Sequence, residues 1–143
     1  MRHTSLWILL TLLGVGLVTS LLTDASARDK KKADRVFEMR TYTTAPGRLD
    51  ALHARFRDHT NKIFVKHGMQ LVGYWTPTDE DTAANTLVYI LAYPSMEARE
   101  ASWKGFRDDP DWKKAFAASK ADGPIVTKVE SQFLVPTDYS PIK

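Results

Sequence analysis

The chain has 143 residues, of which 43% are hydrophobic and 26% are charged, and its formal net charge is +3 at pH 7. This composition excludes a disordered chain, a collagen and a polytopic membrane protein. The sequence has no cysteine, so disulfide bonds, thiolate metal sites, cysteine-held iron–sulfur clusters and a cysteine nucleophile are excluded as well.

Residues 1–27 have the pattern of a secretory signal peptide. A short basic start precedes an almost entirely apolar run over residues 6–22, and a small-x-small cleavage site ends at Ala27. We expect cleavage after Ala27, export to the periplasm or the extracellular space of a bacterium, and no stable membrane association afterwards. The alternative is an uncleaved anchor, because the 17 residues of the apolar run are near the lower limit for a membrane span.

Residues 28–35 are predicted to form a basic linker, with five positive and two negative side chains. Residues 36–143 contain 14 basic and 14 acidic residues, so the folded part is neutral. The positive charge therefore belongs to a short solvated arm, and we expect no nucleic-acid binding. The folded domain is expected over residues 36–136, followed by a C-terminal tail over residues 137–143.

The first predicted strand covers residues 36–44 and ends at Pro46 and Gly47. Its period-two alternation divides the side chains between two faces. These are Phe37, Met39 and Thr41 on one face, and Glu38, Arg40 and Tyr42 on the other.

Residues 48–67 are predicted to form one amphipathic helix that ends at Gly68, and residues 69–75 are predicted to form a second strand. An acidic loop over residues 77–85 precedes a third strand over residues 86–93. This third strand is apolar at nearly every position, which is typical of a strand covered on both faces.

A second helical region begins after Ser95, its predicted N-cap. It restarts at Asp109, which is expected to cap a further helix with Pro110 at the first helical position. The fourth predicted strand covers residues 125–135 and carries Lys128, Glu130 and Gln132 on one face.

The order of these elements, β-α-β-β-α-β, predicts a ferredoxin-like α+β sandwich. Two helices cover one face of a four-stranded antiparallel sheet with the strand order 4-1-3-2. We expect the uncovered face to carry two polar sets, namely Glu38, Arg40 and Tyr42, and Lys128, Glu130 and Gln132. The third strand makes this open face half apolar, and a second copy of the sheet would cover it. The sequence therefore predicts a homodimer.

The ordered motifs of residues 36–136 resemble the NIPSNAP family. The segment from Phe37 to Leu49 is similar to the family pattern E-x-R-x-Y-x-x-x-P-G, and residues 66–68, 72–75 and 109–112 resemble later family segments. The resemblance implies a dimeric α/β barrel, in a superfamily that also includes cofactor-independent monooxygenases, lactone isomerases and haem-degrading enzymes. NIPSNAP proteins themselves resemble binding or scaffolding proteins more than established enzymes.

The histidines of the predicted helix are the first candidate site residues. His59 could act as a general base or an axial haem ligand in a pocket that Trp75, Trp103 and Phe106 also line. His67 lies on the apolar stripe but also suits the negative end of the helix dipole. In the alternative interpretation each histidine caps the helix or fills the edge of the core. The two histidines are about 12 Å apart along the helix axis, so no metal site is predicted.

The polar face of the first strand is the second candidate. Glu38, Arg40 and Tyr42 could bind an acidic or hydroxylated ligand inside the barrel. The alternative is a cross-strand charge ladder with Lys128, Glu130 and Gln132, in which each pair contributes from a few tenths to about 1 kcal/mol.

These observations predict an exported homodimer that binds a small apolar or aromatic molecule or a partner protein, without a cofactor. One alternative is a cofactor-independent monooxygenase, an isomerase or a haem-handling protein that uses His59 and the nearby aromatic residues. Another alternative is a purely structural dimer with a filled core. The sequence has no nucleotide-binding or hydrolase motif that would favour another class.

Overall fold

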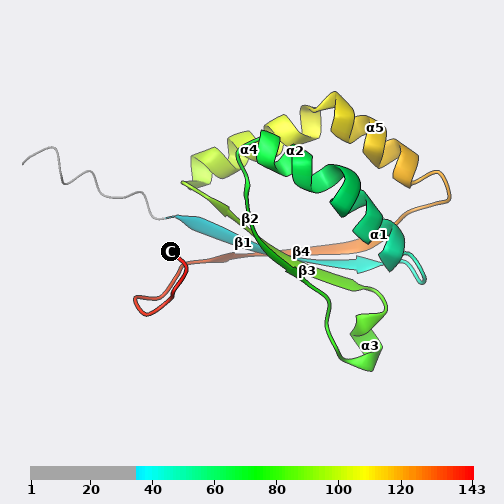
Figure 1. The fold of residues 1–143 in the computed structure, drawn as a ribbon, viewed down its shortest axis with the longest axis horizontal. Coiled ribbons are helices and arrows are strands. Elements are labelled where there is room, and N and C mark those ends of the chain that lie inside the picture. The colour runs from blue at the N-terminus through cyan, green and yellow to red at the C-terminus, as the bar shows by residue number, and fades with distance from the viewer. Residues whose placement is uncertain (1–34) are drawn as a thin grey trace, which may run out of the picture. The chain divides into compact units, whose positions relative to one another are not determined.

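The computed structural model describes residues 35–143 of the chain (Figure 1). Its strands are β1 (Val36–Thr44), β2 (Gln70–Trp75), β3 (Thr86–Tyr93) and β4 (Val126–Leu134). Its helical elements are α1 (Leu49–Arg55), the π-helical turn η1 (Phe56–Thr60), α2 (Asn61–Lys66), α3 (Glu80–Ala83), α4 (Met96–Asp108) and α5 (Pro110–Ser119). The predicted signal peptide, its cleavage site and all but the last residue of the predicted linker lie outside the described residues. Within this part of the chain, no helix has both the length and the apolar character that crossing a membrane requires.

The four strands form one antiparallel sheet in the order β2-β3-β1-β4, which confirms the predicted topology. In Figure 1, α1, α2, α4 and α5 lie together over one face of this sheet, while the short α3 lies in the connection between β2 and β3. This arrangement is the predicted ferredoxin-like α+β sandwich. The central strands β1 and β3 therefore present one set of side chains to the helices.

The first helical region differs from the prediction, because η1 interrupts it between α1 and α2. The backbone N–H of Asn61 donates to the carbonyl of Phe56, five residues earlier, and the Thr60 hydroxyl donates to the Arg55 carbonyl at 3.1 Å. In a regular α-helix each residue is rotated by about 100° around the axis relative to the one before it. The π turn has more residues per turn, so it changes the direction of the side chains within it and after it. As a result Thr60 is buried and His59 is exposed, while Arg55, the last residue of the regular helix α1, is buried as well. Such turns occur frequently at functional sites.

The second helical region follows the predicted capping pattern. Ser95 Oγ accepts a hydrogen bond from the backbone N–H of Ala98 at 3.2 Å, and this bond caps α4. Asp109 Oδ1 accepts a hydrogen bond from the backbone N–H of Asp111 at 2.8 Å and caps α5, with Pro110 in its first turn. These caps fix the angle between two helices that pack over the same sheet face.

The prediction for the polar face of β1 is wrong. The strand register pairs Glu38, Arg40 and Tyr42 with Phe133, Ser131 and Val129 of β4. Trp103 of α4 donates a hydrogen bond to Glu38 at 3.1 Å, so this face is the one under the helices. The set of Lys128, Glu130 and Gln132 lies on the opposite face, and the predicted charge ladder cannot form. Alternation separates the two faces of a strand, but it does not say which face the helices cover.

The helix-free face carries partly buried apolar side chains, among them Met39, Val88 and Ile90. The predicted C-terminal tail folds back toward this face. Ile142 of the tail and Phe37 and Ile90 of the sheet line one hollow of about 350 Å³. The open face is therefore half apolar, as predicted, since it also carries Lys128, Glu130 and Gln132, and the C-terminal tail covers part of it.

Candidate functional site

A buried carboxylate lies at the centre of the helix-facing side of the sheet. Glu38 is completely buried. Arg99 of α4 donates to its two oxygens at 3.0 and 2.9 Å, and Arg40 donates to Oε1 at 2.6 Å. Three uncharged donors complete the set, which we call the Glu38 network: Ser131 Oγ at 2.6 Å, the Tyr93 hydroxyl at 3.1 Å and Trp103 Nε1 at 3.1 Å.

The donors of this network decide the ionisation of the carboxyl group. Burial by itself would raise the pKa of Glu38, but the hydrogen bonds from Arg99, Ser131 and Arg40 outweigh it and lower this pKa to about 2. Burial would likewise lower the pKa of Arg40, and the neighbouring Tyr89, Tyr42 and Glu38 raise it instead. The Glu38 carboxylate is therefore buried, paired with two arginines and fully hydrogen-bonded, which is typical of an element that stabilises the fold, although the Nε of Arg40 has no hydrogen-bond partner.

A cavity of about 290 Å³ lies beside this network, between the helices and the sheet. Six aromatic side chains line it, contributed by Tyr42, Phe56, Phe64, Phe106, Trp112 and Phe116. The rings of Phe106 and Trp112 pack with centroids 4.3 Å apart, and those of Trp112 and Phe116 lie 5.2 Å apart. Val126 and Val129 of β4 contribute to the sheet side of the lining. The lining is therefore mainly flat and apolar.

One charged side chain enters this lining from the junction of α1 and η1. Arg55 is 5% exposed, and its terminal nitrogen Nη1 donates to Ser119 Oγ at 3.3 Å. Its Nε has no hydrogen-bond partner. The guanidinium carbon lies 5.6 Å from the Trp112 ring centroid and 5.4 Å from that of Phe116. Burial lowers the pKa of Arg55, although an arginine remains protonated at neutral pH.

Hydroxyl groups near the cavity are also without partners. Tyr89 is completely buried, and its hydroxyl oxygen and that of Tyr74 accept or donate no hydrogen bond within residues 35–143. Burial raises the pKa of both side chains, so both stay neutral. The two rings stack with centroids 5.5 Å apart, against the same Phe56 that lines the cavity.

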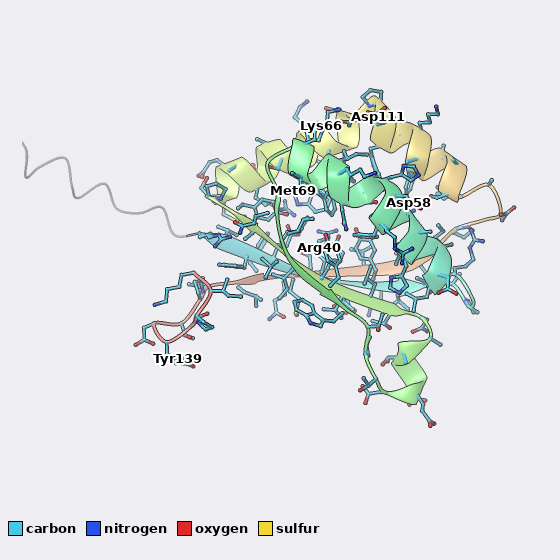
Figure 2. The ribbon with its side chains drawn as sticks, viewed as in Figure 1. Arg40, Asp58, Lys66, Met69, Asp111 and Tyr139 are labelled. Carbon is cyan, nitrogen blue, oxygen red and sulfur yellow. The ribbon has the colours of Figure 1, made fainter. Side chains whose placement is uncertain are left out.

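His59 does not belong to this cavity, and the predicted pocket of His59, Trp75, Trp103 and Phe106 is not formed. His59 is exposed and lines a shallow hollow of the helix layer together with Asp58 and Lys66. Figure 2 shows Asp58 and Lys66 on this helix layer. Trp75 is 51% exposed at the end of β2. The wide turn of η1 explains the error, because it rotates His59 away from the sheet.

The other predicted site residues divide between the two regions. Glu38, Arg40 and Trp103 belong to the Glu38 network, whereas Tyr42 and Phe106 line the cavity. Figure 2 shows Arg40 between the helix layer and the sheet. The strand therefore brings two residues of the predicted polar set, Glu38 and Arg40, to the network and the third, Tyr42, to the cavity.

His67 lies at the junction of α2 and α5. Its Nε2 is 2.7 Å from Asp109 Oδ2, which also pairs with Lys66 Nζ at 2.8 Å. The hydrogen bonds from Lys66 and His67 lower the pKa of Asp109. The His67 ring packs against Gly105, where an added Cβ would lie 2.5 Å from Nδ1. These contacts tie the end of α2 to the start of α5 and leave His67 outside the cavity.

Sequence reasoning missed Arg55, Trp112 and Phe116 as site residues. Trp112 and Phe116 are one helical turn apart, a signal that favours the core and a pocket wall equally. Arg55 lies at the edge of the apolar stripe of α1, three residues after the buried Leu52, and a charged residue at such a position usually faces solvent. Within residues 35–143, no cluster of His, Asp and Glu is arranged to hold a metal ion.

Comparisons with known proteins agree on one family. The sequence profile of the NIPSNAP family matches residues 37–141. The structure is similar to a NIPSNAP family protein with unknown function from Agrobacterium tumefaciens, with a TM-score of 0.66 and 25% identity over 78% of this chain and 96% of that chain. It is also similar to an uncharacterised NIPSNAP-like domain protein from Burkholderia xenovorans, with a TM-score of 0.66 and 19% identity over 76% and 90% of the two chains.

A more distant likeness links the fold to an enzyme. SnoaB, a cofactor-independent oxygenase from Streptomyces nogalater, aligns with a TM-score of 0.52 and 17% identity over 76% of this chain and 99% of that chain. At this identity the likeness concerns the fold alone. No functionally curated protein matches the chain.

Proposed function

The chain belongs to the NIPSNAP family, and on that premise we propose that it binds one small, largely aromatic molecule in the cavity between the helices and the sheet. The observation that carries this proposal is the cavity lining, with six aromatic side chains around a volume of about 290 Å³. Ligand pockets usually combine such apolar walls with a few polar groups, at volumes upward of about 300 Å³. The volume here suits a molecule of one or two fused rings.

Calorimetric titration with the neutral probe 2-naphthalenemethanol tests this proposal. We expect one site per chain with a Kd on the order of 100 µM, from the affinity per atom of small apolar ligands. Val129→Trp places a large ring in the cavity wall and should abolish the heat of binding. Val65→Trp is the matched control, because Val65 is 59% exposed and does not line the cavity. Equal binding by both variants, or no binding by the wild type, would contradict the proposal.

A second candidate function is a cofactor-independent oxygenase, and the specific observation that favours it is the buried cation in the cavity. The fold likeness to SnoaB agrees with this candidate. An enolisable aromatic ketone would lose its α-proton to water, and Arg55 would stabilise the enolate that results. Addition of O2 to the enolate carbon forms a carbon–oxygen bond, and protonation then gives a hydroperoxide. Oxygen uptake with 2-tetralone separates the two functions. Uptake above the buffer rate that Arg55→Gln abolishes supports the enzyme, and binding without uptake supports the binding protein.

The apolar helix-free face supports a homodimer in which two sheets pack face to face. Met39, Val88 and Ile90 would be covered in such a pair, and the C-terminal tail would lie at its edge. Light scattering on residues 28–143 should give twice the monomer mass. A monomer at micromolar concentration would rule out this assembly.

Export from the cytoplasm is the remaining part of the proposal, and it depends on residues 1–27 alone. Mass spectrometry of the protein from the producing cell should find a chain that begins at Arg28. A chain that retains Met1 in the membrane fraction would instead indicate an anchor.

A further inference from the structure

We infer that the molecule bound in this cavity is a monoanion, an aromatic carboxylate whose charged group pairs with the Arg55 guanidinium. This inference rests on the proposed function and adds the chemical class of the ligand. It depends on three features of the described residues, namely the missing counter-ion of Arg55, the geometry of its guanidinium and the charge of the cavity lining.

The first feature is that Arg55 is buried without an anion. It is 5% exposed, and among residues 35–143 it takes part in no ion pair. The Ser119 hydroxyl is its hydrogen-bond acceptor, at 3.3 Å. A buried charge without a partner is costly, so proteins retain such a charge where a ligand completes it. The molecule shows the contrast itself, because the other buried arginine of this face, Arg40, pairs with Glu38 at 2.6 Å.

The second feature is the shape of the acceptor that Arg55 requires. The guanidinium lies near the rings of Trp112 and Phe116, at 5.6 and 5.4 Å from their centroids. Aromatic rings around a guanidinium satisfy its charge in part but not its N–H donors. The unpartnered Nε and the neighbouring terminal nitrogen form the planar fork that binds a carboxylate through two parallel hydrogen bonds.

The third feature is that the cavity lining is positive. Arg55 and Lys120 are its ionisable cations, and no aspartate or glutamate is part of it. Lys120 is exposed, and its Nζ lies 4.5 Å from the Phe116 ring centroid, where it can guide an anion to the cavity. One buried cation in an aromatic lining matches one negative charge on a flat apolar body. We therefore assign a monocarboxylate rather than a neutral ring system.

A matched pair of probes tests the inference. Calorimetry compares 2-naphthoate with 2-naphthalenemethanol, which have the same rings and differ in the charge of the substituent. Wild-type protein should bind 2-naphthoate about tenfold to a hundredfold more tightly, which is the usual strength of a charged hydrogen-bonded pair. Arg55→Met should abolish this preference and leave the affinity for 2-naphthalenemethanol within about threefold. Arg57→Met removes the same charge from an exposed position of η1 and should leave the preference unchanged.

The outcomes separate the inference from the proposed function. Equal affinity of the wild type for both probes, or tighter binding of the neutral probe, overturns the assignment of the ligand as a monoanion. The cavity would still be a binding site. Binding of neither probe overturns both. If Arg57→Met and Arg55→Met lose the preference for 2-naphthoate equally, the overall charge of the protein causes this preference. That result would also overturn the inference. The comparison of the two probes on the wild type needs no variant, so it holds even if Arg55→Met does not fold.

Discussion

Two buried cations on the same face of the sheet have opposite surroundings. Arg40 lies in the Glu38 network, where it pairs with a carboxylate at 2.6 Å. Arg55 lies in the cavity lining, where it has a serine hydroxyl and two aromatic rings but no carboxylate. The Nε of both arginines lacks a hydrogen-bond partner, so the contrast between them is the carboxylate that Arg40 has and Arg55 does not. The difference separates a group that stabilises the fold from a group that is ready to bind a ligand.

The largest effect is expected from breaking the complete network. Glu38→Gln removes the negative charge that Arg40 and Arg99 share, and it should lower the free energy of unfolding by about 3–5 kcal/mol. Urea unfolding followed by circular dichroism measures this change. Glu130→Gln is the control, because Glu130 is exposed on β4, and it should cost about 1 kcal/mol at most. Similar losses in the two variants would show that the Glu38 network does not hold the fold.

The same network should make the free energy of unfolding depend on pH. The pKa of Glu38 is lowered to about 2 in the folded protein from a usual value of 4.5. A lowered pKa stabilises the folded state above pH 4.5, and this contribution disappears as the pH falls from 4.5 toward 2. From pH 7 to pH 3 the wild type should therefore lose on the order of 2 kcal/mol more than Glu38→Gln does. Urea unfolding of both proteins at the two pH values measures the difference, and parallel losses would contradict the assignment.

Much of the fold could be predicted from the sequence. The residues that could not be placed from the sequence depend on local features of the structure. The strand order and the caps at Ser95 and Asp109 follow from periodicity and turn chemistry. The sequence did not predict which face of β1 packs against the helices. A buried glutamate with several hydrogen-bond donors cannot be told from a solvent-facing glutamate in the sequence. Arg55 could not be predicted either, because an arginine beside an apolar stripe usually faces solvent. The sequence therefore predicts the strand order and the helix caps well, and the residues that line the cavity in part.

The family could also be predicted from the sequence. The pattern of Glu38, Arg40 and Tyr42 followed by Pro46 and Gly47 resembles the NIPSNAP family, and the match over residues 37–141 confirms it. The structure gives a physical role to the glutamate, the arginine and the tyrosine of the pattern. The glutamate and the arginine form the network, and the tyrosine lines the cavity. The family pattern therefore marks both regions of the comparison.

A smaller effect is expected when the incomplete site receives its anion. At ten times its Kd, 2-naphthoate should raise the free energy of unfolding by about 1.4 kcal/mol through mass action on the folded state. The rise should fall to about 0.4 kcal/mol or less in Arg55→Met at the same concentration and should be unchanged in Arg57→Met. Urea unfolding with and without the probe measures it. Equal stabilisation of the wild type and Arg55→Met would place the carboxylate elsewhere on the protein.

The smallest effect should come from removing the unpaired cation. Arg55→Met keeps an apolar side chain of similar length in the lining and removes a buried charge that has no counter-ion. The lost interactions with Trp112 and Phe116 are worth about 0.5–1 kcal/mol each, and relief from the desolvated charge offsets them. The free energy of unfolding should therefore stay unchanged or rise by up to about 1 kcal/mol.

Arg40→Met is the matched control, because it makes the same substitution inside the complete network. It leaves Glu38 with a weakened set of donors and should lower the free energy of unfolding by about 2–3 kcal/mol. Urea unfolding of the two variants measures the contrast directly. If Arg55→Met lost about as much stability as Arg40→Met, Arg55 would be a structural residue like Arg40, and its missing anion would no longer indicate a ligand. The sign of this contrast decides whether an unsatisfied buried charge belongs to the fold or to the function.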